Sequence, residues 1–168
     1  MLSTFSALSL LLAIPAESKP RQSVDCILEG LDSANSAQIA AEGAIFIETG
    51  NFSAGVGPLL TTAPACMALY HWSAAQTQLA GRYTIAKLAL PSAEAELRRK
   101  GINPEKLKAI YLSLPTANRS RIFTRSDAAI MVSKSQAAGL VRSDSELSIL
   151  GRYVGLLNMI DAIPTMIG

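Results

Sequence analysis

Small, helix-favouring side chains dominate this sequence, and this feature constrains the fold more than any motif does. Alanine, leucine and serine are the commonest residues, whereas aromatic residues make up only 5% of the chain. Sheets are stabilised by aromatic and β-branched cross-strand pairs, while helices that carry small side chains can pack closely. The composition therefore predicts an all-α fold, a compact bundle-like array of about six or seven helices.

Helix start signals recur along the chain. Ser73 with Gln76 and Ser143 with Glu146 stand at capping-box spacing, and each pair predicts a helix N-terminus. Asn103 followed by a proline predicts another. With apolar residues at helical spacing, these signals predict helices over residues 23–30, 33–49, 73–90, 92–100, 104–114 and 121–138, and a last helix from residue 144 onward.

Glycine and proline predict where the helices are interrupted. Residues 50–64 are rich in glycine and are expected to form a loop, after which Pro64 suits the first turn of a short helix. Pro91 is expected to end the helix that begins at Ser73, because proline lacks a backbone N–H. Neither a repeat nor a long linker divides the chain, so residues 17–168 are expected to form a single helical domain.

The first sixteen residues predict export. They contain no charged side chain, and the apolar run from Ala7 to Ile14 is shorter than the roughly 20 residues that a spanning helix needs. Residues 1–16 are therefore interpreted as a signal peptide, cleaved after Ala16, of a periplasmic or secreted protein. One alternative is a cytoplasmic protein with an ordered N-terminal helix. Another is a membrane-associated subunit that uses residues 1–16 as an apolar contact element.

The chain contains two cysteines, Cys26 and Cys66, which lie on either side of the first long helical segment. In an oxidising compartment they are expected to form a disulfide bond. Closing this loop would stabilise the fold by about 4 kcal/mol if the bond acts on the entropy of the unfolded chain. The alternative is a pair of reduced, buried thiols in a cytosolic core.

The densest cluster of metal-binding and nucleophilic side chain types predicts two alternative kinds of site. If residues 64–72 are helical, Met67 and His71 lie one turn apart and could bind a soft metal ion such as Cu(I). Alternatively, Cys66 could serve as a nucleophile with His71 as its base, although on one straight helix the two would point about 140° apart. Methionine and a lone histidine are more often structural.

Known catalytic motifs and cofactor motifs give no support for an enzyme. The sequence lacks GxxxxGK[ST], GxGxxG, GxSxG, HExxH and CxxC, and its one histidine excludes a site built from several histidines. No cofactor and no catalytic residue are therefore predicted.

Positive charge is concentrated in one part of the chain. Residues 17–90 carry four basic and six acidic side chains, whereas residues 91–168 carry eleven basic and seven acidic ones. A basic stretch in the second half could bind an anionic partner, and an envelope component is favoured over nucleic acid if the protein is exported. Its eight cations are Arg98, Arg99, Lys100, Lys106, Lys108, Arg119, Arg121 and Arg125, and the only acid among them is Glu105.

These features favour an exported, non-enzymatic protein that acts by binding or by structural association, with an anionic envelope component or another protein as its partner. The first alternative is a small metal-handling protein or a cysteine-dependent enzyme centred on Cys66, Met67 and His71. The second is the membrane-associated subunit.

Overall fold

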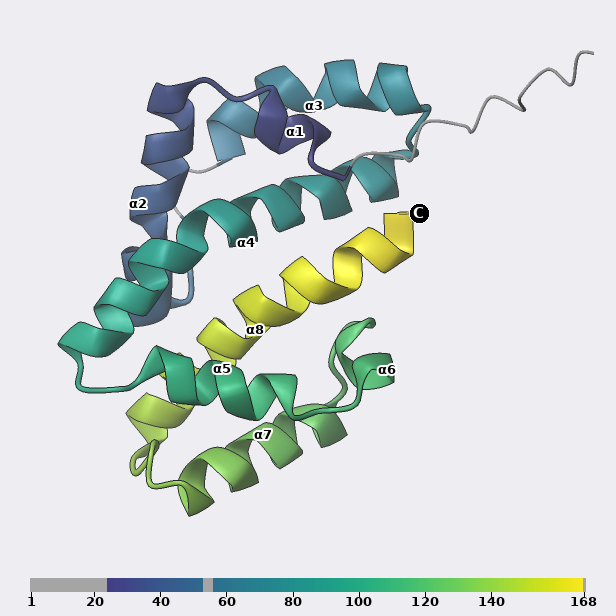
Figure 1. The fold of residues 1–168 in the computed structure, drawn as a ribbon. Helices are drawn as coiled ribbons and strands as arrows, with labels where there is room; N and C mark the ends of the chain where they lie inside the picture. Colours follow the sequence, from purple (N-terminus) through teal and green to yellow (C-terminus); the bar gives the residue numbers. More distant parts are fainter. Residues whose placement is uncertain (1–23, 53–55, 168) are drawn as a thin grey trace, which may run out of the picture.

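The computed structural model describes residues 24–52 and 56–167, and the predicted signal peptide therefore lies outside the described residues. Within the described ranges the chain forms eight helices and no strand, which confirms the all-α prediction (Figure 1). Two of the helices are single turns. The helices are α1 (Cys26–Glu29), α2 (Ser33–Thr49), α3 (Val56–Tyr70), α4 (Ala74–Arg99), α5 (Pro104–Leu112), α6 (Thr116–Arg119), α7 (Arg125–Ala137) and α8 (Asp144–Ile167).

The two longest helices, α4 and α8, form the centre of the molecule. They lie side by side, with α1, α2 and α3 packed on one side of the pair and α5, α6 and α7 on the other (Figure 1). The buried apolar residues form two clusters, one that includes residues of α5 and α7 and one that includes residues of α1 and α3, and Met159 and Ile160 of α8 contact both clusters. The helices α4 and α8 therefore join the two halves of the core.

The capping signals in the sequence are confirmed. Ser73 and Gln76 form the capping box of α4, and the Ser143 side chain accepts a hydrogen bond from the backbone N–H of Glu146 at the start of α8. Asn103 caps α5 by accepting from the N–H of Lys106 at 2.8 Å. These short-range interactions satisfy backbone donors that have no partner inside the helix.

The prediction that Pro91 ends a helix is wrong, because α4 continues through it to Arg99. A proline in a helix interior costs about 3 kcal/mol. Burial on both sides of the proline offsets that cost, since Ala89, Ala93 and Leu97 are fully buried. The hydroxyl of Ser92 also donates a hydrogen bond to the carbonyl oxygen of Ala40 in α2. Tertiary contacts therefore hold this segment in the helix.

The prediction of a loop over residues 50–64 is also wrong, because α3 begins at Val56. Pro58 lies in the first turn of α3, where a missing N–H removes no helical hydrogen bond. Pro64 lies in the interior instead of starting the helix. The buried side chains of Leu59 and Cys66 pack α3 against the rest of this half of the core and favour the helical conformation.

A disulfide joins α1 to α3. The sulfur atoms of Cys26 and Cys66 lie 2.14 Å apart and their Cα atoms 5.9 Å apart. The predicted pairing of the two cysteines is therefore confirmed. A second contact holds α1 in place, since Lys87 of α4 forms an ion pair with Asp25 at 2.9 Å.

Helices α2 and α4 approach each other very closely at Gly43 of α2. A Cβ atom built on Gly43 would lie 2.0 Å from the carbonyl oxygen of Ala89 and 2.3 Å from the hydroxyl of Ser92, both in α4. The backbone oxygen cannot move without displacing α4. Only glycine therefore allows α2 to lie this close to α4.

We expect Gly43→Ala to lower the free energy of unfolding by about 2–3 kcal/mol, because the added methyl group must push the two helices apart. The matched control is Gly151→Ala in α8, where an added Cβ would meet no atom within 4 Å. This control should leave stability unchanged or raise it by roughly 0.5–1 kcal/mol. Urea unfolding followed by circular dichroism measures both, and equal effects of the two substitutions would contradict the close approach.

Candidate functional site

Acidic residues of α4 itself and of α2 and α5 neutralise part of the predicted basic stretch at the end of α4. Arg99 lies 2.6 Å from Glu96 and 3.1 Å from Glu48 of α2. Lys100 lies 3.3 Å from each of the same two acids. Hydrogen bonds from Arg99 hold the pKa of the largely buried Glu96 below its usual range. Arg98 likewise pairs with Glu105 and, at 3.8 Å, with Glu94.

Two more of the predicted cations hold the connection between α6 and α7 onto the rest of the molecule. Arg119 lies 2.7 Å from Asp161 of α8, and Arg121 lies 2.6 Å from the buried Asp127 of α7. The amide of Asn158 in α8 donates to the carbonyl oxygens of Arg119 and Arg121 at 3.1 and 2.9 Å. Both arginines therefore have a structural role.

Three cations of the predicted stretch, Lys106, Lys108 and Arg125, form no ion pair with any of the described residues. All three are exposed. They do not lie together, since Lys106 and Lys108 belong to α5 whereas Arg125 begins α7. The eight predicted residues consequently do not form one binding surface.

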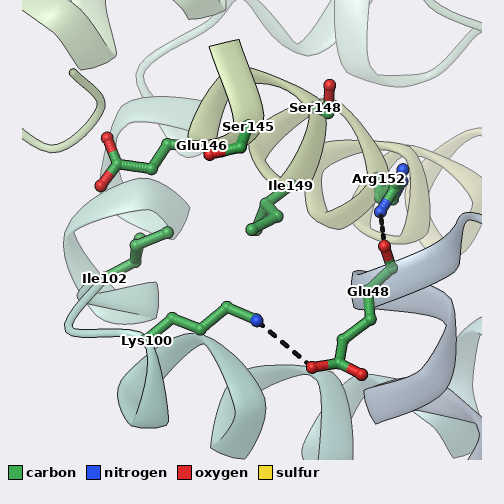
Figure 2. Close-up of a pocket in the computed structure, with 8 residues that line it drawn as sticks. All are labelled: Glu48, Lys100, Ile102, Ser145, Glu146, Ser148, Ile149 and Arg152. Carbon is green, nitrogen blue, oxygen red and sulfur yellow. Dashed lines mark hydrogen bonds and ion pairs between the residues drawn. The ribbon is translucent and has the colours of Figure 1, made fainter. Parts of the chain in front are cut away.

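A hollow of about 630 Å³ lies where the C-terminal ends of α2 and α4 meet the start of α8. Figure 2 shows the side chain of Lys100 reaching across this hollow to the carboxylate of Glu48. Arg152 of α8 donates to the carbonyl oxygens of Ile47 and Glu48 at 2.7 and 2.6 Å, and so caps the end of α2. The lining residues are Glu48, Lys100, Ile102, Ser145, Glu146, Ser148, Ile149 and Arg152.

A second hollow, of about 300 Å³, adjoins the first and shares Ile102 and Glu146 with it. It adds the side chains of Lys106 and Arg142, and neither has an acidic partner among the residues that the structure describes. We call these two neighbouring spaces the joined hollows.

Glu146, the acidic residue that lines the second hollow, already accepts hydrogen bonds from the backbone. The Glu146 carboxylate accepts hydrogen bonds from the backbone N–H groups of Arg142 and Ser143 at 2.5 and 3.1 Å. In Figure 2 its carboxylate points away from Lys100 and Glu48. The joined hollows are lined by four cations, Lys100, Lys106, Arg142 and Arg152, and two acids, Glu48 and Glu146. The start of α8 adds the positive end of a helix dipole. This end of the molecule is therefore suited to an anion.

The cluster around His71 does not have the geometry on which its predictions depended. Helix α3 ends at Tyr70, and His71 has a positive φ of 54°, so Met67 and His71 do not stand one above the other on a helix. Cys66 is joined to Cys26, and a sulfur atom in a disulfide is not a nucleophilic thiolate. The cysteine-dependent alternative would first require reduction of this bond.

The described ranges contain neither a metal-binding cluster nor a membrane-spanning helix. These residues hold no group of three or more histidine, cysteine, aspartate or glutamate side chains that could bind a metal ion. None of the described helices combines the length and the hydropathy required to cross a membrane. No protein-family model, no curated protein and no solved structure matches this chain. The candidate site therefore depends on the geometry of the joined hollows alone.

Sequence reasoning found Lys100 and Lys106 but missed Arg142 and Arg152. The two missed residues lie outside the basic stretch, and each stands alone among neutral or acidic neighbours in the sequence. Only folding brings the start of α8 beside the ends of α2 and α4. The capping box at Ser143 was the one sequence signal near these residues, because it marks a helix N-terminus. It does not indicate which other helices pack beside that N-terminus.

The buried Asp127 predicts how stability depends on pH. A hydrogen bond from Arg121, and further ones from Thr124, hold the pKa of Asp127 well below its usual range. Its charge therefore stabilises the fold above the unfolded-state pKa of about 3.9, and this contribution is lost as pH falls through the lower folded-state pKa. We expect Asp127→Asn to be less stable than the wild type at neutral pH, and the difference to shrink below about pH 4.

The matched control for this prediction is Asp144→Asn, because Asp144 is exposed in the first turn of α8. Urea unfolding at neutral pH and at about pH 3 measures both variants against the wild type. Asp127→Asn should lose clearly more stability than the control at neutral pH. A loss that is equal for the two variants, or that does not change with pH, would contradict the stabilising role of the Asp127 charge.

Proposed function

We propose that this protein is an exported helical binding protein that holds an anionic group of its partner in the joined hollows and has no chemistry of its own. The observation that carries the proposal is the position of Lys106 and Arg142. Both side chains line one hollow beside the start of α8, and the nearby carboxylate of Glu146 is turned onto backbone N–H groups. An anion placed there would interact with two positive charges that form no ion pair with any acid of the described chain.

Export is supported by two independent features. The first is the uncharged, apolar start of the sequence, and the second is the pair of cysteines at disulfide distance. Disulfide bonds persist in oxidising compartments and are rare in the cytosol. We propose that residues 17–168 are the mature protein and that they form a single domain in the periplasm or outside the cell.

The partner that fits is an anionic envelope component that carries carboxylate or phosphate groups. The guanidinium of Arg142 can bind either group with two parallel hydrogen bonds, and Lys106 adds a second charge. The buried side chain of Ile102 and the partly buried Ile149 supply apolar contact for the remainder of such a molecule. Recognition of this kind weakens as salt is added, because exposed charges are screened over about 10 Å at 0.1 M ionic strength.

We expect the double variant Lys106→Glu/Arg142→Glu to weaken binding to phosphatidylglycerol-containing vesicles by at least about tenfold at low salt, because each cation near an anionic surface contributes roughly 1 kcal/mol. The matched control is Lys108→Glu/Arg125→Glu, which changes net charge equally at two exposed, unpaired cations outside the hollows. Vesicle co-sedimentation measures binding, with neutral phosphatidylcholine vesicles as the blank.

A parallel titration with inorganic phosphate, followed by amide chemical shifts, distinguishes a headgroup from a free anion. Shifts confined to the joined hollows would support a site for the anionic group itself. Equal loss of vesicle binding in the two double variants would show that only net charge matters, and this result would contradict the proposed site. Absence of any binding to anionic vesicles and to phosphate would contradict the proposed function.

A further inference from the structure

The two cations of the second hollow that have no acidic partner are held by different kinds of structure. Lys106 belongs to the first turn of α5, where its backbone N–H donates to the side chain of Asn103 at 2.8 Å. Arg142 lies instead in the connection between α7 and α8, two residues before α8 begins. A helix fixes its side chains more precisely than a connecting segment does. The distance between the two cations therefore depends on how this connection is held.

The connection is held at two neighbouring points. The side chain of Val141 is buried in the apolar cluster that includes residues of α5 and α7. Directly after it, the backbone N–H groups of Arg142 and Ser143 donate to the carboxylate of Glu146 at 2.5 and 3.1 Å. Val141 therefore holds the residue before Arg142, and Glu146 holds the backbone of Arg142 itself.

The side chain of Arg142 has no ion pair to hold it. It is exposed, and no acid of the described ranges lies within ion-pair distance of it. The direction in which its guanidinium leaves the chain is consequently set by the Arg142 backbone. Because Glu146 accepts a hydrogen bond from that backbone, the Glu146 carboxylate determines where the guanidinium can reach.

We propose that Glu146 is a positioning residue of the anion site, and that its carboxylate holds the Arg142 backbone so that Arg142 and Lys106 contact the same anion. This inference rests on the proposed function, because it concerns the site assigned there. Glu146 acts in this role as a hydrogen-bond acceptor. Its negative charge opposes binding, since Glu146 lines both of the joined hollows and would repel an anion placed in either.

Substitution can separate the acceptor of Glu146 from its charge. Glutamine keeps a carbonyl oxygen that can accept from the two backbone N–H groups, but it carries no charge. Alanine removes both the acceptor and the charge. Glu146→Gln should therefore bind inorganic phosphate at least as tightly as the wild type. Glu146→Ala should bind phosphate at least about fivefold more weakly than Glu146→Gln, because Arg142 is then no longer held beside Lys106.

The matched control is Asp144, an exposed acid in the first turn of α8 that lines neither of the joined hollows. Asp144→Asn and Asp144→Ala should bind phosphate equally, because the Asp144 side chain does not hold the connection. Phosphate titrations of the disulfide-bonded protein at low salt, followed by amide chemical shifts, measure the dissociation constant of each variant. Circular dichroism should show the same helical content in all of them.

A double-mutant cycle distinguishes positioning from a general loss of structure. Adding Arg142→Ala should weaken phosphate binding about tenfold in the Glu146→Gln background but less than about twofold in the Glu146→Ala background, because an arginine that is not held contributes little. Adding Lys106→Ala should weaken binding in both backgrounds, since Lys106 is held by α5. A purely structural role of Glu146 would not produce this difference between the two cations.

Hydrogen exchange gives a readout that needs no ligand. The backbone amides of Arg142 and Ser143 should exchange faster in Glu146→Ala than in Glu146→Gln. Equal exchange, equal phosphate affinity of these two variants, or an equal effect of Arg142→Ala in both would overturn this inference and leave the anion site in place. Failure of the wild type to bind phosphate would also overturn it, and the vesicle assay would then show whether the proposed function fails as well.

Discussion

The close approach of α2 and α4 at Gly43 is the contact on which the rest of the structure depends. No side chain separates the two backbones there, and the hydroxyl of Ser92 links α4 directly to a carbonyl oxygen of α2. This contact sets the direction in which α2 runs along α4. As a result the C-terminal turn of α2 reaches the end of α4, where Glu48 meets Arg99 and Lys100. This crossing therefore brings together Glu48 and Lys100, two of the residues that line the larger hollow.

Short-range signals explain which parts of the fold could be predicted. A capping box or an Asn-Pro start involves only three or four neighbouring residues, and the starts of the helices after Ser73, Asn103 and Ser143 were all predicted correctly. Two of the errors concern proline, and a third is the helix predicted over residues 121–138, which begins only at Arg125. At Pro91 and Pro64 the local cost of a lost hydrogen bond is outweighed by burial of neighbouring side chains, and that burial depends on segments far away in the sequence.

The candidate site was predicted only in part, because its charges are balanced over long distances. The sequence showed a basic stretch with one acid in it, yet Arg99 meets an acid 51 residues away and Arg119 one that is 42 residues away. Such pairings cannot be read from local spacing. Together with ion pairs to acids near in the sequence, such as Glu96 and Asp127, they convert most of the stretch into structural ion pairs. The segment at the start of α8 supplies Arg142 and Arg152 in their place. Likewise, the helical spacing of Met67 and His71 could not reveal that His71 takes a left-handed conformation after the helix.

We propose that this protein is a disulfide-bonded helical domain of an oxidising compartment. The most direct test is the intact mass of the protein purified from its native host under non-reducing conditions, with thiol alkylation after unfolding. We predict a mass that corresponds to a chain beginning at Glu17, with Cys26 and Cys66 both resistant to alkylation. A full-length chain with two reactive thiols would contradict the claim and would place the protein in a reducing compartment.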